Sequence, residues 1–359
     1  MAQSRLPYID ALRGFAILLV LFMHTAANLK GLPWWLTNLC GFGARGVQLF
    51  FVVSAFTLFT VYRTPLNVRS FFIRRVMRIA PMYYLAIAVY LLRDGLGSRP
   101  EAPHGVSVIH ILSNLLFVHG WSAETPNAVV PYGWSVGCES MFYLAFPLLL
   151  AWITSIRRAA IAFVLSLAPA VAALHLMPRL AVGEPAWLAQ ASGYWNPIAE
   201  APVFLAGALA YRLSADLDLT RFRPFARAAL PLLVIATAAL AAFLPRLAHY
   251  LVAGVLFAVL VFLLSIWSPR LLVNRVTCWI GAVSYSVYLT HDLVLRPVEQ
   301  YIRPIVQAEG PIATFLVTFS ATLAGALLIS AVTYRYVEQP MMALGKVFTR
   351  RRAAALAPA

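Results

Sequence analysis

The chain has 359 residues, of which 62% are hydrophobic and only 11% are charged, and its mean hydropathy is +0.79. A soluble domain has about 45–50% apolar and about 25% charged residues, so this composition excludes a soluble globular protein and indicates a polytopic membrane protein. The formal net charge of +15 is explained by membrane topology, because the basic residues fall between apolar segments. We therefore expect a lipid bilayer as partner and no nucleic acid.

Ten apolar segments are candidates for spanning helices, which need about 20 residues each. They are residues 11–29, 44–62, 79–93, 131–153, 158–176, 197–212, 228–244, 248–267, 277–295 and 312–334. The predicted fold class is therefore all-α, a polytopic membrane helical bundle of about ten transmembrane helices. Residues 106–119 are apolar but short and rich in His, Ser and Asn, so we expect a re-entrant or interfacial segment there.

The basic residues predict the orientation of this bundle. Most of the lysines and arginines fall at those segment ends that share a side with the N-terminus. By the positive-inside rule this places both termini in the cytoplasm and the chain in the inner (cytoplasmic) membrane. We expect a membrane domain over residues 1–345 and a disordered basic cytoplasmic tail over residues 346–359.

Three ionisable residues lie well inside the predicted spans: His24, Glu139 and His291. At about 1.5 Å per helical residue, His24 and His291 lie about 20 Å from the inner ends of their spans, and Glu139 about 12 Å from its outer end. All three therefore fall at a similar depth in the outer half of a hydrocarbon core of about 30 Å. Ionisable residues in spans usually face a bundle interior or a cavity, and two imidazoles with a carboxylate can form a general acid/base group.

Arg13 and His24 are eleven residues apart, about three helical turns, so they share a face of the first helix. This face is predicted to line a path from the cytoplasmic side to the histidine, and Asp10 is spaced to pair with Arg13. The alternative is that His24 only hydrogen-bonds a neighbouring helix.

The segment "RSFFIRRVMRIAPMYY" places Arg75 and Arg78 three residues apart at the start of the third span. Their guanidinium groups share a helix face and would suit the phosphates of a ligand. The alternative is that both are positive-inside anchors. Cys40, Cys138 and Cys278 are far apart and have no metal-ligand spacing, so we expect neither a disulfide nor a metal.

Six motifs, taken in order, resemble those of acyltransferase family 3, the multispanning membrane O-acyltransferases. They are "YIDALRGFAILLVLFMH" with Asp10, Arg13 and His24; "GVQLFFVVSAFTLFT"; "FFIRRVMRIAPMYYLA" with Arg75 and Arg78; "WSVGCESMFYLAFP" with Trp134, Ser135, Glu139 and Tyr143; "SYSVYLTH" with Tyr285 and His291; and "YRYVEQP". The family usually has an acidic residue at Gln48 and glycine at Ala55, and these departures concern the substrate rather than the chemistry.

The resemblance implies transfer of an acyl group, often acetyl, from cytoplasmic acyl-CoA or acetyl-CoA to a hydroxyl of a carbohydrate acceptor, in the stand-alone form without a fused periplasmic domain. His24, Glu139 and His291 would be catalytic, with His24 as general base or transient acyl carrier. Arg13, Arg75 and Arg78 would bind the donor. Asp10, Trp134, Ser135, Tyr143 and Tyr285 would support substrate or structure.

Two other classes of protein fit the same buried residues. In a transporter or flippase, the buried His, Glu and Arg would form a substrate pathway. In a structural or sensor membrane protein, they would only hold helices together.

Overall fold

The computed structural model describes residues 6–243 and 249–355, with side chains to residue 349. Within these ranges the chain is helical and has no β-strand, which confirms the predicted all-α class. Eight helical runs are long and apolar enough to cross a membrane. They are Pro7–Ala26, Trp34–Val61, Val68–Asp94, Trp134–Trp152, Ile156–Leu180, Ala186–Asp216, Leu219–Phe243 and Pro311–Thr349.

The other two predicted spans are also helices, although they fall outside these eight runs. Helix α12 (Tyr250–Ile266) is apolar and has 17 residues. Helix α13 (Arg275–Pro297) has 23 residues but carries a polar series that includes Ser284, Thr290 and His291. Each of the ten predicted segments thus overlaps a helix of the protein.

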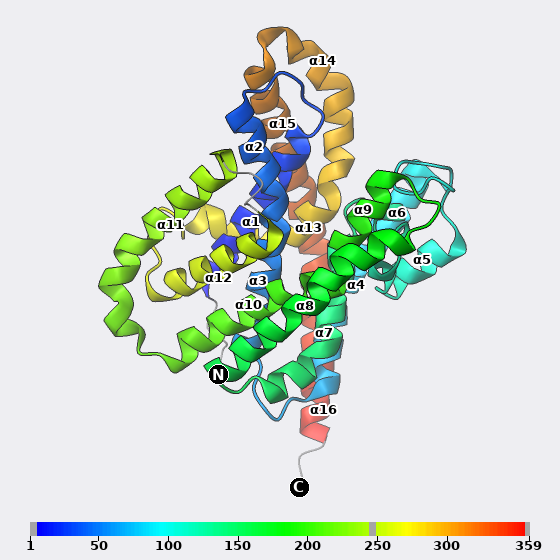
Figure 1. The fold of residues 1–359 in the computed structure, drawn as a ribbon. Helices are drawn as coiled ribbons and strands as arrows, with labels where there is room; N and C mark the ends of the chain where they lie inside the picture. Colours follow the sequence, from blue (N-terminus) through cyan, green and yellow to red (C-terminus); the bar gives the residue numbers. More distant parts are fainter. Residues whose placement is uncertain (1–5, 244–248, 356–359) are drawn as a thin grey trace. The chain divides into compact units, whose positions relative to one another are not determined.

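The remaining helices follow the same chain order. They are α1 (Pro7–Ala26), α2 (Trp34–Phe42), α3 (Gly46–Val61), α4 (Val68–Asp94), α5 (Val108–Leu115), α6 (Thr125–Ala128), α7 (Trp134–Trp152), α8 (Ile156–Leu180), α9 (Ala186–Tyr194), α10 (Pro197–Asp216), α11 (Arg223–Phe243), α14 (Arg303–Val306), α15 (Pro311–Thr333) and α16 (Gln339–Ala355). Figure 1 shows this order. Helix α5, over the segment expected to be re-entrant or interfacial, has only 8 residues and is too short to span a bilayer.

The expected disordered tail needs correction. Helix α16 continues through the predicted boundary at residue 346 as far as Ala355. The physical reason is packing on α4, where the Thr349 hydroxyl is buried and accepts hydrogen bonds from the Arg74 guanidinium at 3.1 and 3.2 Å. Residues 356–359 of the expected tail lie outside the described residues.

The chain divides into two compact units. The first comprises Met1–Tyr62, Ile153–Ser166 and Pro202–Leu328, and the second comprises Arg63–Trp152, Leu167–Ala201 and Ile329–Ala359.

The first unit is organised around α1, which packs against α13 and α3 (Figure 1). Gly14 of α1 and Gly281 of α13 bring the two backbones into direct contact. A Cβ on Gly281 would overlap the carbonyl oxygen of Asp10, and one on Gly14 would overlap that of Thr277. Close approach through small residues is how helices associate in lipid, where hydrophobic burial gives little drive.

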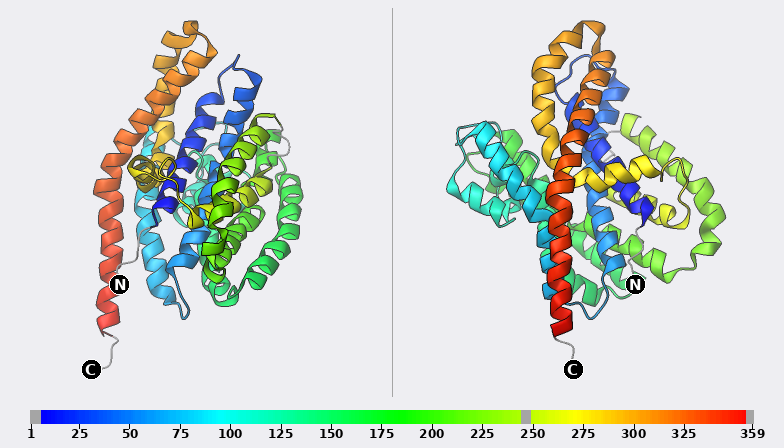
Figure 2. Two further views of the ribbon diagram at one scale, coloured as in Figure 1. Left: turned by 90° about the vertical axis from the view of Figure 1, so that its left-hand side faces the viewer. Right: turned by 180° about the vertical axis from the view of Figure 1, so that it is seen from behind.

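In the second unit, α4 packs against α16, and the two helices lie side by side in both views of Figure 2. Helix α4 begins earlier than the predicted residue 79, because the side chain of Asn67 caps it by accepting a hydrogen bond from the Ser70 amide at 2.9 Å. Phe71 stacks on Phe146 of α7 with ring centroids 5.1 Å apart. The arginine cluster is therefore held inside a helix.

We expect Gly281→Ala to lower the free energy of unfolding by about 1–3 kcal/mol, because the added methyl group must push α1 and α13 apart. Thermal unfolding in detergent micelles measures this effect. Gly41→Ala is the matched control, since a Cβ at Gly41 meets no atom within 4 Å. Equal unfolding temperatures for the two variants would contradict the direct backbone contact.

Candidate functional site

His24 and His291 face each other in the first unit. Their ring centroids are 5.1 Å apart and the rings are tilted by 35°. The side chains are buried, with 9% and 1% of their surfaces exposed. Each histidine lies ten residues beyond the glycine at which its helix touches the other, Gly14 in α1 and Gly281 in α13. The two helices therefore run parallel, and their contact sets both imidazoles at one level.

The ring orientation of His291 is fixed by its own helix. Its Nδ1 lies 2.7 Å from the carbonyl oxygen of Tyr288. Because a carbonyl only accepts, Nδ1 carries the hydrogen and the lone pair of the neutral ring is on Nε2. The neighbouring Asp292 instead pairs with Arg296, with 2.9 Å between Oδ2 and Nε. His291 therefore has the protonation pattern of a general base.

Arg13 is held by one predicted partner and one that the sequence did not indicate. Its Nη1 lies 3.7 Å from Oδ1 of Asp10, as the spacing predicts. Its Nη2 also donates to Oγ1 of Thr57 in α3, at 3.3 Å. The Thr57 hydroxyl hydrogen is donated to the carbonyl of Val53 at 2.6 Å, which leaves the oxygen to accept from Arg13. The guanidinium group is thus fixed between α1 and α3.

Glu139 lies on α7 in the second unit. It accepts a hydrogen bond from the hydroxyl of Tyr143 at 2.6 Å, one helical turn further along. The Arg75 guanidinium carbon lies 5.7 Å from the centre of the Tyr143 ring, a cation–π distance. Glu139, Tyr143 and Arg75 therefore form one cluster, and the meeting of Glu139 with the two histidines stays a prediction.

Arg75 and Arg78 share a helix but contact different neighbours. Arg75 lies over the rings of Phe71 and Tyr143. Arg78 is directed to α16, where its Nη1 lies 3.4 Å from Sδ of Met342. Joint binding of one phosphate group by both arginines stays a prediction.

Three further predicted residues lie on the same helices as the candidate catalytic groups. Trp134 is buried against Tyr194, with ring centroids 5.0 Å apart, and its amide donates to Oδ1 of Asn127 at 3.2 Å. Ser135 is buried beside it on α7. Tyr285 is half-buried on α13, between Gly281 and His291.

Sequence reasoning missed a buried network behind α7, which centres on His119. Its Nε2 lies 3.0 Å from the carbonyl oxygen of Gly133 and 3.3 Å from the hydroxyl of Tyr83, which donates to Oδ1 of Asn114 at 2.7 Å. The imidazole also packs directly under Gly137, where a Cβ would come within 2.9 Å of Nε2. This network supports the helix two residues before Glu139, and only the tertiary fold reveals it.

Among the described residues, no group of three or more His, Cys, Asp or Glu side chains could hold a metal ion. The arrangements above are acid/base and cationic groups made by the chain itself.

Comparison with known proteins identifies the family. The acyltransferase domain family matches residues 6–331, nearly the whole chain. The chain belongs to this acyltransferase family. No solved structure matches it.

Three relatives illustrate the range of the acyltransferase family. Acyltransferase MdmB of Streptomyces mycarofaciens is 29% identical over 161 residues, which cover 43% of this chain and 41% of the relative. YrhL of Bacillus subtilis, named as a peptidoglycan O-acetyltransferase, is 26% identical over 96% of this chain and 56% of its own length. The exopolysaccharide production protein ExoZ of Rhizobium meliloti is 32% identical over 107 residues, 29% of this chain and 33% of its own. The chain thus spans about half or less of the length of each relative.

Burial gives the stability of the protein a dependence on acid through His119. Desolvation lowers the pKa of this imidazole from 6.5 to about 4. As the pH falls from about 6.5 towards 4, the unfolded chain binds a proton that the folded chain does not, so the folded state loses up to about 3 kcal/mol. We expect His119→Gln to flatten the decrease in unfolding temperature between pH 7 and pH 4.

The control is His104→Gln, which changes an exposed histidine outside the spans. It should leave the pH dependence unchanged. Equal pH profiles for wild type and His119→Gln would show that this imidazole does not set the acid limit.

Proposed function

We propose that the chain transfers an acyl group, usually acetyl, from acyl-CoA to a hydroxyl of a cell-surface or exported glycan. The observation that carries the proposal is the buried pair of His24 and His291 in a chain of the acyltransferase family. Imidazole exchanges protons near neutral pH and is the commonest general base in enzymes. Two such rings in direct contact inside a membrane bundle are expensive to bury, and acyl transfer gives them a chemical role.

The reaction needs one proton acceptor and one stabiliser of negative charge. His24 removes the proton of the acceptor hydroxyl while the hydroxyl oxygen attacks the thioester carbonyl carbon. The carbon–sulfur bond then breaks, and the CoA thiolate leaves with the proton that the imidazole returns. The products are an ester and free CoA. His291 positions the acceptor or acts as second proton carrier, and its Nδ1–H bond to Tyr288 presents Nε2 for this task.

A carbonyl oxygen under attack gains negative charge, which a fixed cation stabilises. Arg13, held by Asp10 and Thr57, is proposed for this role or for binding the donor. Arg75 and Arg78 are proposed to bind the donor phosphates on the cytoplasmic side. Glu139 is proposed to orient an imidazole and stabilise its charged form, as the carboxylate of a catalytic triad does.

The glycan acceptor is proposed from the names of the relatives. One is named for peptidoglycan O-acetylation and another for exopolysaccharide production. Both names concern polymers of the cell surface, which fits a chain with eight helical runs able to cross a membrane. We further propose the inner membrane, with both termini in the cytoplasm, from the distribution of basic residues.

We expect His24→Ala to abolish acyl release from radiolabelled acetyl-CoA in inside-out membrane vesicles, with a rate loss of about 100-fold or more. His175→Ala is the control, because His175 is exposed on α8. Equal rates in wild type and His24→Ala, at equal protein levels, would contradict the proposal. Loss of glycan transport without any change in acyl release would favour a transporter.

We expect Tyr143→Phe to lower kcat/KM by about tenfold, because the Glu139 carboxylate loses its hydrogen-bond donor while the ring remains under Arg75. The abundance of the protein should stay the same. Initial rates with varied acetyl-CoA measure this effect. An unchanged kcat/KM would remove Tyr143 from the proposed support of Glu139.

A further inference from the structure

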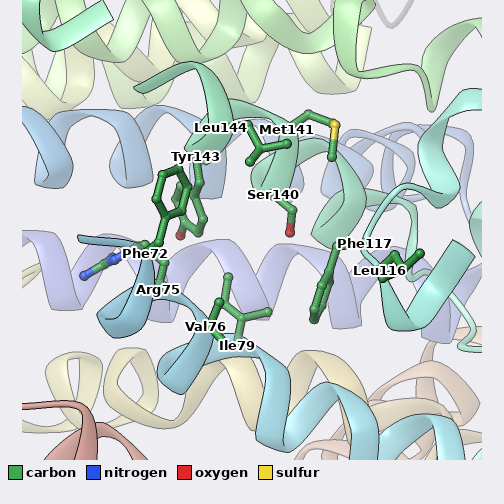
Figure 3. A pocket seen from close by; sticks show the side chains of 10 residues that line it. All are labelled: Phe72, Arg75, Val76, Ile79, Leu116, Phe117, Ser140, Met141, Tyr143 and Leu144. Atoms are coloured by element: carbon green, nitrogen blue, oxygen red, sulfur yellow. The ribbon is translucent and has the colours of Figure 1, made fainter. Parts of the chain in front are cut away.

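A cavity of about 180 Å³ lies in the second unit, between α4, α7 and the residues that follow α5. Figure 3 shows the side chains around it. Most of the lining is apolar, as Val76, Ile79, Phe117 and Leu144 illustrate. A dry apolar space of about 150 Å³ inside a protein is large enough to bind benzene. The present cavity therefore has room for a hydrocarbon segment of the order of six carbon atoms.

The rim of the cavity opens towards lipid. Three lining residues, Val76, Leu116 and Leu144, are exposed by 52%, 68% and 58%. Val76 and Leu144 belong to helices long and apolar enough to span the membrane, so their exposed apolar side chains face hydrocarbon. On α5, Val108, Ile109 and Leu112 are also exposed and continue this apolar surface to Leu116 at the rim. A hydrocarbon chain can thus enter from the bilayer.

One end of the cavity carries a positive charge. In Figure 3, Arg75 stands at the opposite end of the lining from Phe117, and its guanidinium group points away from Phe117. Guanidinium groups bind phosphate with a fork of parallel hydrogen bonds. The cavity therefore combines an apolar space with a cationic end, which is the charge pattern complementary to a lipid with an anionic phosphate head.

We propose that this cavity binds one hydrocarbon chain of an anionic bilayer phospholipid, whose phosphate contacts Arg75. The chain lies along Val76 and Ile79 of α4 and passes Ser140 and Tyr143 of α7. Because the Tyr143 hydroxyl also holds Glu139, lipid occupancy affects the orientation of that carboxylate. The lipid site itself does not depend on the proposed acyl transfer, because its direct readout is lipid binding.

The test uses the whole protein in lipid nanodiscs that contain phosphatidylglycerol with a photoreactive diazirine on one acyl chain. After illumination, mass spectrometry locates the labelled residues. We expect labels on residues 72–79 and 140–144 in wild type. Leu144→Trp should reduce this labelling by about tenfold, because the indole ring occupies the space of the chain. Leu148→Trp is the matched control, since Leu148 is exposed one turn further along α7 and does not line the cavity.

A second pair of variants covers a failure of Leu144→Trp to fold. Val76→Phe should reduce the labelling, whereas Leu92→Phe, on an exposed position of α4 outside the lining, should not. Equal labelling within either pair would overturn the proposal.

The charge is tested with a diacylglycerol probe, which carries the same photoreactive chain but no phosphate. It should label wild type about tenfold less than phosphatidylglycerol does, and Arg75→Gln should remove this difference. Equal labelling of wild type by both probes would overturn the phosphate contact. Displacement of the phosphatidylglycerol probe by excess palmitoyl-CoA, but not by excess unlabelled phosphatidylglycerol, would assign the cavity to the donor and also overturn the proposal.

Discussion

The direct backbone contact of α1 and α13 is the constraint on which the candidate active site depends. Gly14 and Gly281 have no side chain, so the carbonyls of Thr277 and Asp10 occupy the space where a Cβ would stand. From this contact both helices rise in parallel by ten residues, about 15 Å, to His24 and His291. The distance between the two imidazoles is therefore set by a contact about three turns away. A rigid base of this kind is what holds catalytic groups in a productive geometry.

The third helix of this arrangement extends the same principle. A Cβ on Gly43 or Gly46 would overlap a carbonyl oxygen of α1, so the residues leading into α3 also lie directly on the α1 backbone. This close approach brings Thr57 within hydrogen-bonding distance of Arg13. Small residues thus position both the imidazole pair and the arginine, and in a membrane such packing replaces the hydrophobic drive that water supplies to soluble proteins.

The sequence predicted the parts of this site that follow from helical geometry alone. Depth along the spans placed His24 and His291 at one level, and the spacing of Asp10 and Arg13 predicted their ion pair; both are observed. The sequence did not predict that Arg75 and Arg78 would turn to different neighbours, because the direction of a long side chain depends on the helices packed around it. It also missed His119, whose partners come from loops that have no periodic pattern. The disordered tail was wrong for residues 346–355 because burial of Thr349 against α4 stabilises α16.

The central claim is that His24 and His291 act as one chemical unit, and a double-mutant cycle tests it most directly. The rate of acyl transfer is measured for His24→Ala, His291→Ala and the double variant at equal protein levels. Groups that act as a unit are strongly non-additive, so the account predicts that the double variant is no slower than the slower single variant. Two rate losses that multiply in the double variant would show independent roles and contradict the account.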